Sequence, residues 1–126
     1  DGQPRPLHLE KALQVIDWTQ TARPVAPILP ELTQPGGLVA RLLLDDPHFH
    51  VEEWTVDAPC QIQHDARSFW ILFPVDGDVR IKTPGQPAMI LQRRSTCLLP
   101  AALASFALQP AREGGGPVRL LAIRQP

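Results

Sequence analysis

The sequence predicts an all-β domain, an antiparallel β-sandwich or jelly roll, preceded by one short α-helix. After Gly36 and Gly37 the chain consists of short apolar or alternating runs bounded by turn residues, a pattern typical of closely spaced antiparallel strands. Proline accounts for 15 of the 126 residues. Because proline is excluded from helix interiors and central strands, this share favours short elements with stiff connections. The runs cover residues 38–44, 49–56, 68–75, 78–83, 88–92, 96–100, 105–109 and 118–123.

The N-terminal part carries the one clear helical pattern. Residues 7–16, with the sequence LHLEKALQVI, place apolar side chains at helical spacing and polar side chains between them. Pro6 stands just before this pattern, where a proline is tolerated in the first turn of a helix. We therefore predict a helix that ends near Asp17.

A proline-rich stretch, residues 21–37, separates this helix from the strands. It can form neither a helix nor a central strand. We expect an extended strap that crosses the domain surface, with Ile28 and Leu29 as apolar anchors. The chain thus divides into a linker helix and strap packing on the domain, residues 1–35, and a β-sandwich, residues 36–126.

Two of the runs differ in their patterning. Residues 68–75, SFWILFPV, are nearly all apolar and predict a central strand that is buried on both faces. Residues 78–83, DVRIKT, alternate and predict a strand that faces water on one side. In that strand we expect Val79 and Ile81 to point inward and Arg80 and Lys82 to point outward.

The connections carry recognisable turn signals. Asp76-Gly77 lies between two runs and predicts a hairpin. Pro84-Gly85 predicts a second turn, and the glycines at 114–116 predict a loop before the last strand.

Composition excludes several classes of function. The net charge is −1 and the only adjacent basic pair is Arg93-Arg94, so no basic stripe for nucleic acid is present. No apolar run reaches the roughly 18 residues of a membrane span, and no secretory pattern opens the chain. We expect a cytoplasmic protein that binds neither nucleic acid nor membrane. Cys60 and Cys97 are then expected to be reduced, mostly buried thiols.

The strongest local candidate for chemistry is DPHFHVEEW, residues 46–54. On a strand, His48, His50 and Glu52 would share one face, and two imidazoles with a carboxylate are a plausible metal set. A fourth ligand is missing, since His64 is too near in sequence to join without special geometry. We therefore expect no metal site in this chain, with these three residues as the alternative.

Other polar and aromatic candidates have simpler structural explanations. His8 is expected to be a packing residue of the helix. His64 and Asp65 form either an oriented acid/base pair or part of a loop. Ser68 lacks the glycines of a nucleophile elbow, so hydrolase chemistry has no support. We assign no catalytic residue in this chain. Three tryptophans form either a sugar-stacking surface or part of the core: Trp18, Trp54 and Trp70.

Two stretches together resemble a known family, the short bacterial type I mannose-6-phosphate isomerases. The opening DGQPRPLHLEKALQVID is similar to the segment that follows the catalytic cupin domain of these enzymes, and SFWILFPVDGDVRI with STCLLPAAL is similar to their C-terminal cupin. HFHVEEW also fits, where the family has an aromatic-x-Val-Glu strand. The matching residues are Gly2, Arg5, Leu7, His8, Ala12, Leu13, Val15 and Ile16, then Phe49, Val51, Glu52, Phe69, Ile71, Leu72, Val75, Gly77, Leu98, Leu99, Pro100 and Ala101.

The resemblance implies a cupin-like β-sandwich that is the C-terminal accessory domain of an aldose–ketose sugar-phosphate isomerase. The zinc ligands of the family, a Gln, two His and a Glu, and its catalytic Arg lie upstream of the matching segment. No position here matches them, so we expect zinc in an upstream domain and no complete active site in this chain. The implied partner is that upstream catalytic cupin, and a homodimer is a further option.

Two local departures from the family are visible. The family has Gly-Asp before its Leu-Leu-Pro-Ala strand, where this chain has Arg94-Ser95, so the turn is expected to be rebuilt. His48 and His50 are similar to the first half of a cupin metal motif, but no His follows Pro100 to complete it.

Two rival classes of function stay open. The chain is either such an accessory domain or a self-standing small cupin that binds a sugar or a metal ion, and a purely structural or oligomerisation domain is a third option. Metal lost on His50→Ala would favour the binding module. The aromatic residues Phe69, Trp70 and Phe73 suggest that the interior of the barrel is filled.

Overall fold

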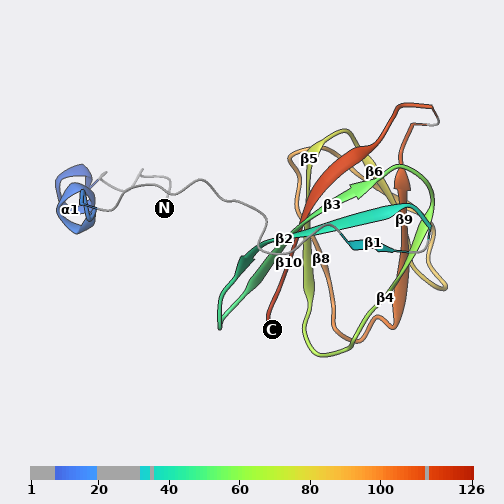
Figure 1. The fold of residues 1–126 in the computed structure, drawn as a ribbon, viewed down its shortest axis with the longest axis horizontal. Helices are drawn as coiled ribbons and strands as arrows, with labels where there is room; N and C mark the ends of the chain where they lie inside the picture. Colours follow the sequence, from blue (N-terminus) through green and yellow to red (C-terminus); the bar gives the residue numbers. More distant parts are fainter. Residues whose placement is uncertain (1–7, 20–31, 35, 113) are drawn as a thin grey trace, which may run out of the picture.

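The computed structural model describes residues 8–19, 32–34, 36–112 and 114–126, and Figure 1 shows their arrangement. Within them the chain forms one helix and ten strands. They are α1 (Leu9–Val15), β1 (Leu32–Gln34), β2 (Leu38–Asp45), β3 (His50–Val56), β4 (Cys60–Gln63), β5 (Trp70–Asp76), β6 (Val79–Lys82), β7 (Met89–Leu91), β8 (Cys97–Leu99), β9 (Ser105–Pro110) and β10 (Val118–Arg124).

The strands form two antiparallel sheets. One has the order β1-β2-β3-β10-β5-β8 and the other the order β4-β9-β6-β7. The facing sets β3-β10-β5-β8 and β4-β9-β6-β7 have the strand order of a jelly roll. From β3 to β10 every connection crosses between the two sheets, except the one from β6 to β7, which pair within one sheet. The all-β prediction with one short helix is therefore confirmed.

Each of the eight predicted runs contains a strand, and two further strands were not predicted. β1 pairs with β2 across the turn at Gly36 and Gly37, and β4 pairs with β9 in the register Cys60↔Leu108. Both are short strands in proline- or turn-rich sequence. Pairing with a partner far along the chain, rather than local pattern, makes β4 a strand.

The core lies between the two sheets and is filled by large apolar side chains. Alternation places one face of each strand inward, as in β6, where Val79 and Ile81 are buried and Arg80 and Lys82 are exposed as predicted. The largest of the fully buried side chains, from both sheets, are Trp54, Phe106, Leu38, Leu72, Ile81, Leu108 and Leu120.

Strand β5 is central, but the prediction that it is buried on both faces is wrong. Trp70, Leu72 and Pro74 are buried, whereas the alternate residues are half-buried or exposed. Phe73 therefore belongs to the outer face of the sheet and does not fill the interior. Pro74 is tolerated because β8 pairs only with Trp70–Leu72, and beyond it the Pro74 carbonyl accepts a hydrogen bond from the Arg94 amide at 2.8 Å.

The two predicted turns have different outcomes. Pro84-Gly85 joins β6 to β7, which pair as an antiparallel hairpin. Asp76-Gly77 joins β5 to β6, and these strands belong to different sheets. The predicted hairpin at Asp76-Gly77 is therefore wrong, and this turn instead carries the chain from one layer of the sandwich to the other.

Helix α1 has no buried residue, and its apolar side chains Leu9, Leu13 and Ile16 are exposed. Most of the strap lies outside the described residues. The packing of residues 1–35 on the sandwich therefore stays a prediction. In the described part of the chain, no helix has the length and apolar character that crossing a membrane requires.

Candidate functional site

The end of the sandwich where β10 finishes gathers polar and aromatic side chains. Arg124, the last residue of β10, lies opposite His50 of β3 on one side and opposite Trp70 of β5 on the other. Two residues earlier on the inner face, Ala122 lies opposite Glu52. We call Glu52, His64, Asp65, Trp70 and Arg124 the end cluster.

Two tryptophans form the inner wall of this cluster. The rings of Trp54 and Trp70 are 4.9 Å apart between centroids and tilted by 47°, a favourable aromatic geometry. The Trp54 indole N–H donates to Oε2 of Glu52 at 2.7 Å. Both tryptophans thus belong to the core, whereas Trp18 is 71% exposed near the helix. The described residues therefore do not combine the three rings into a stacking surface.

The opposite wall comes from the segment that follows β4. His64 continues the pairing of β4 with β9, since its amide donates to the Ala104 carbonyl at 3.0 Å. Its ring packs edge-on against Trp70, with 6.4 Å between centroids. The side chain of His64 is 0% exposed. This histidine is therefore a core residue that bridges the two sheets.

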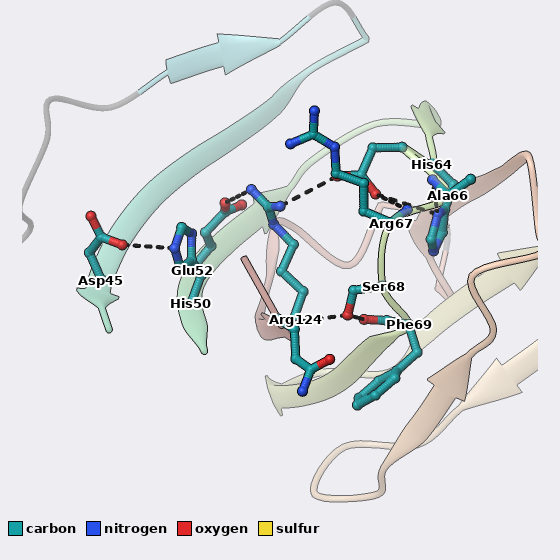
Figure 2. Close-up of polar contacts among 11 residues, drawn as sticks. Asp45, His50, Glu52, His64, Ala66, Arg67, Ser68, Phe69 and Arg124 are labelled. Atoms are coloured by element: carbon teal, nitrogen blue, oxygen red, sulfur yellow. Dashed lines mark hydrogen bonds and ion pairs between the residues drawn. The ribbon is translucent and has the colours of Figure 1, made fainter. Parts of the chain in front are cut away.

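Of the two alternatives for His64 and Asp65, the acid/base pair does not form. Nδ1 of His64 accepts a hydrogen bond from the backbone N–H of Ala66 at 3.0 Å, whereas the nearest Asp65 oxygen is 3.9 Å away, which is too long for a hydrogen bond. Asp65 instead accepts from the Arg67 amide at 3.1 Å. Figure 2 shows these contacts, and the loop alternative is the one that the structure adopts.

Ser68 fastens this loop to the end of β10. Its hydroxyl donates to the Phe69 carbonyl and accepts from the Gln125 amide, both at 3.1 Å. The side chain is buried and both interactions are structural.

Arg124 closes the cluster on the solvent side. Its guanidinium carbon lies 5.1 Å from the centre of the Trp70 ring, within reach of a cation–π interaction. Its terminal nitrogens lie 3.5 Å from an Asp65 oxygen and 3.9 Å from a Glu52 oxygen. Arg124 is therefore held between the loop and β3 (Figure 2). We did not predict Arg124, although it stands at the next inward position after Leu120 and Ala122.

The structure does not bring the metal alternative together. His48 lies in a bend before β3 and is exposed, so strand alternation does not apply to it. Nε2 of His50 lies 2.8 Å from Asp45, and Glu52 accepts from Trp54. Among the described residues no group of three or more His, Cys, Asp or Glu side chains could hold a metal ion.

A second feature is the outer face of the six-stranded sheet. Val51, Ile123, Ile71 and Leu98 form one cross-strand row, since each lies opposite the next. The neighbouring row contains Leu121 and Phe73. These side chains are half-buried, except Leu98, which is 58% exposed. We call these six residues the apolar face.

Charged residues border the apolar face. Arg119 pairs with Asp76 at 2.7 Å and with Glu53 at 3.9 Å, and Glu53 also contacts Arg41 at 3.4 Å. The backbone N–H of Arg119 donates to the Asp76 carboxylate at 2.7 Å. This hydrogen bond, together with the Arg119 guanidinium, lowers the pKa of Asp76 below its ordinary value of 3.8. An apolar patch with a charged rim is typical of an interaction surface.

The other end of the sandwich contains a hollow of about 460 Å³ near the β9–β10 connection. Arg93, Arg112 and Asp78 contribute the charged groups that line it. The Arg93 amide donates to the Asp78 carboxylate at 2.9 Å, so part of this charge serves to fix the turn. The connection includes residue 113, which lies outside the described residues, and we assign no site there.

No protein-family model and no curated protein matches this sequence. Solved structures do match. The cupin-2 domain of an XRE family transcriptional regulator from Enterobacter cloacae superposes with a TM-score of 0.60 at 15% identity, over 71% of this chain and 96% of that one. The EutQ protein of Clostridium difficile superposes with a TM-score of 0.59 at 10% identity, over 73% of this chain and 70% of that one.

A longer protein matches as well. A structure assigned as a mannosephosphate isomerase from Archaeoglobus fulgidus superposes with a TM-score of 0.54 at 20% identity. The match covers 64% of this chain and 24% of that one. At these identities the likeness concerns the fold alone, and the fold of this chain is a cupin-type β-sandwich.

Proposed function

We propose that this chain acts as a C-terminal accessory cupin domain of a mannose-6-phosphate isomerase-like protein and is catalytically incomplete alone. The observation that carries the proposal is the apolar face of the six-stranded sheet. The resemblance to the isomerase family runs in order along nearly the whole chain. The match to about a quarter of a longer isomerase-like structure is consistent with a domain-sized role.

The apolar face is suited to packing against another domain. Ile71, Phe73 and Val75 continue along β5 on the side that points away from the core, and Leu98 extends the surface onto β8. Burying such apolar groups stabilises an interface by roughly 25 cal/mol per Å². The six-stranded sheet thus has an apolar outer face in addition to its apolar inner face. A partner domain that covers the outer face explains this.

Chemistry in the intact protein would come from the upstream domain. The resemblance implies that zinc there polarises the sugar oxygens during isomerisation. The described residues of this chain offer no ligand set that fits zinc, so we assign no catalytic step to them. The contribution of this chain is packing area for a cytoplasmic enzyme.

The first test concerns the coding sequence upstream of Asp1 and the domain that it encodes. We expect a zinc-binding cupin there that binds the 126-residue chain in isothermal titration calorimetry. Leu98→Glu should weaken this binding at least tenfold, because the substitution buries a charge in the interface. The matched control is Ile90→Glu on the other sheet, where Ile90 is 55% exposed. Equal effects of the two substitutions would contradict the proposal, and so would the absence of an upstream domain.

The second test concerns activity. The chain alone, incubated with mannose 6-phosphate and zinc, should form no fructose 6-phosphate above the background rate. Robust turnover would overturn the accessory role.

A self-standing cupin that binds a small molecule is the second candidate. One specific observation favours it, namely the unpartnered donors in the end cluster, and this site is developed below.

A further inference from the structure

Three buried N–H groups in the end cluster have no acceptor. They are Nε2 of His64, Nε1 of Trp70 and Nε of Arg124. The His64 side chain is fully buried and Trp70 is 7% exposed. A buried donor without a partner loses the hydrogen bond that it would make to water, so it destabilises the fold. Such groups are rare in folded proteins, and three around one tryptophan ring require an explanation.

All three groups are donors, as the hydrogen bonds of the cluster establish. The Ala66 amide donates to Nδ1 of His64, so the lone pair of this nitrogen is used. The proton of the neutral imidazole then resides on Nε2. Indole and guanidinium nitrogens carry hydrogens and accept nothing. The end cluster therefore has an excess of donors that only an acceptor can satisfy.

The nearby carboxylates leave this excess in place. Oε2 of Glu52 is taken by Trp54 at 2.7 Å. Asp65 serves the Arg67 amide and contacts Arg124 only at 3.5 Å. The Glu52 contact with Arg124, at 3.9 Å, is longer than a hydrogen bond. The cation is thus weakly paired on both sides and is able to exchange partners.

We propose that the end cluster binds the carboxylate group of a small organic acid. The carboxylate accepts from His64 and Trp70 and pairs with Arg124, which exchanges its long contacts with Asp65 and Glu52 for a charge-assisted one. A carboxylate fits because it carries acceptors and no donors. A neutral sugar would bring hydroxyl donors of its own, for which the carboxylates already in use leave little capacity.

This site is independent of the accessory role. It lies on the inner side of the six-stranded sheet, whereas the proposed docking surface lies on the outer side. Failure of the acid to bind would leave the docking proposal untouched. Failure of docking would likewise leave the ligand site intact.

The experiment follows the indole N–H signals of the 126-residue chain by nitrogen–proton NMR in a Trp18→Phe background, which leaves Trp54 and Trp70 as reporters. Sodium acetate is titrated at constant ionic strength. We expect the Trp70 signal to move downfield along a saturable curve, because its proton gains an acceptor. The Trp54 signal should move little, because Glu52 already accepts from it. Two unmoved signals would overturn the proposal and indicate that ordered water alone satisfies the donors.

Variants on the same strand distinguish the site from general charge effects. Arg124→Leu should weaken acetate binding at least tenfold. The control is Arg119→Leu, since Arg119 lies on β10 with its side chain 51% exposed on the outer face, and it should bind acetate as the parent chain does. Equal affinities of both variants would overturn the assignment. Arg124→Lys retains the charge without the planar guanidinium group and should bind acetate with intermediate affinity. If Arg124→Leu does not fold, the Arg124→Lys variant provides the test.

Two further ligands define the class. Inorganic phosphate is also an oxyanion. If it binds more tightly than acetate, the carboxylate assignment is overturned and the ligand is a phosphoryl compound. Mannose tests the neutral alternative. A saturable response to mannose without any response to acetate would refute the oxyanion class.

Discussion

The turn at Gly77 should tolerate alanine far less well than the turn at Gly85, although both glycines adopt left-handed backbone. Their φ angles are +70° and +72°. An alanine in this conformation is strained by roughly 1–2 kcal/mol, partly offset by the stiffer unfolded chain. A Cβ at Gly85 meets nothing within 4 Å, whereas at Gly77 it would lie 2.9 Å from Cγ2 of Val118.

Val118 has little freedom to move aside. It is 6% exposed and lies opposite Val56 in the β3–β10 ladder. Forcing extra volume into a packed site destabilises by typically about 1–3 kcal/mol. Gly85→Ala should therefore lower the free energy of unfolding by about 1 kcal/mol, and Gly77→Ala by about 2–4 kcal/mol.

Urea unfolding followed by circular dichroism measures both changes. With a slope of about 2 kcal/mol per M, the midpoints of the two variants should differ by roughly 1 M. Val118→Ala removes the clashing methyl groups, so it should reduce the effect of Gly77→Ala in a double-mutant cycle. Equal midpoints for the two glycine variants, or strict additivity in the cycle, would refute the packing argument and leave backbone strain alone.

Three further predictions concern stability and reactivity. Phe106→Ala should lower the free energy of unfolding by about 3–5 kcal/mol in urea denaturation, because the ring is fully buried between the sheets; a change below about 1 kcal/mol would contradict the core assignment. The Arg119 contacts lower the pKa of Asp76 in the folded state, so their stabilisation is present above pH 4 and is lost as the pH falls through the lowered value. Since both side chains are about half exposed, Asp76→Asn should lower the free energy of unfolding only slightly at pH 7 and leave it unchanged in acid. A larger loss of stability in acid than at pH 7 would contradict the predicted pH dependence. Burial raises the pKa of both thiols, so a thiol reagent should modify both slowly in the folded protein. Cys97 should react before the more buried Cys60, and the two should react at equal rates only after unfolding in urea.

The strands could be predicted because their signal is local. Alternation in β6 follows from residues 79–82 alone, and the structure confirms it. Partners in the ladder are not local. Whether Asp76-Gly77 makes a hairpin or crosses between layers depends on where β10 and β9 insert, and those strands lie more than 25 residues farther along the chain.

The apolar run of β5 shows a second limit of sequence reasoning. Its composition predicts burial on both faces, yet among the described residues only the inner face is buried. An apolar sequence indicates that a strand face is buried, but it does not indicate whether the same chain or a partner buries it. The mistaken expectation for Phe73 is therefore explained if a partner domain supplies the missing layer.

The end cluster was the hardest part to predict, because its members come from β3, the segment after β4, β5 and β10. Asp65 and Arg124 are 59 positions apart, and only the β10 register places Arg124 beside Trp70. His64 was recognised as a candidate, with an acid/base pair with the adjacent Asp65 and a place in a loop as the two alternatives. Backbone groups decided otherwise, since the Ala66 amide occupies Nδ1, and no side-chain pattern signals a backbone donor.

Strand β10 connects the two proposed activities and also makes them separable. Ile123 points outward in the apolar face, and its neighbour Arg124 belongs to the end cluster. Successive side chains of a strand lie on opposite faces, so Ile123→Glu should disturb docking without removing a donor, and Arg124→Leu should do the reverse. If Ile123→Glu also abolished acetate binding by the isolated chain, in which no covering domain is present, the outer face of β10 would affect the ligand site through the strand itself. The separation of the two sites along β10 would then be refuted.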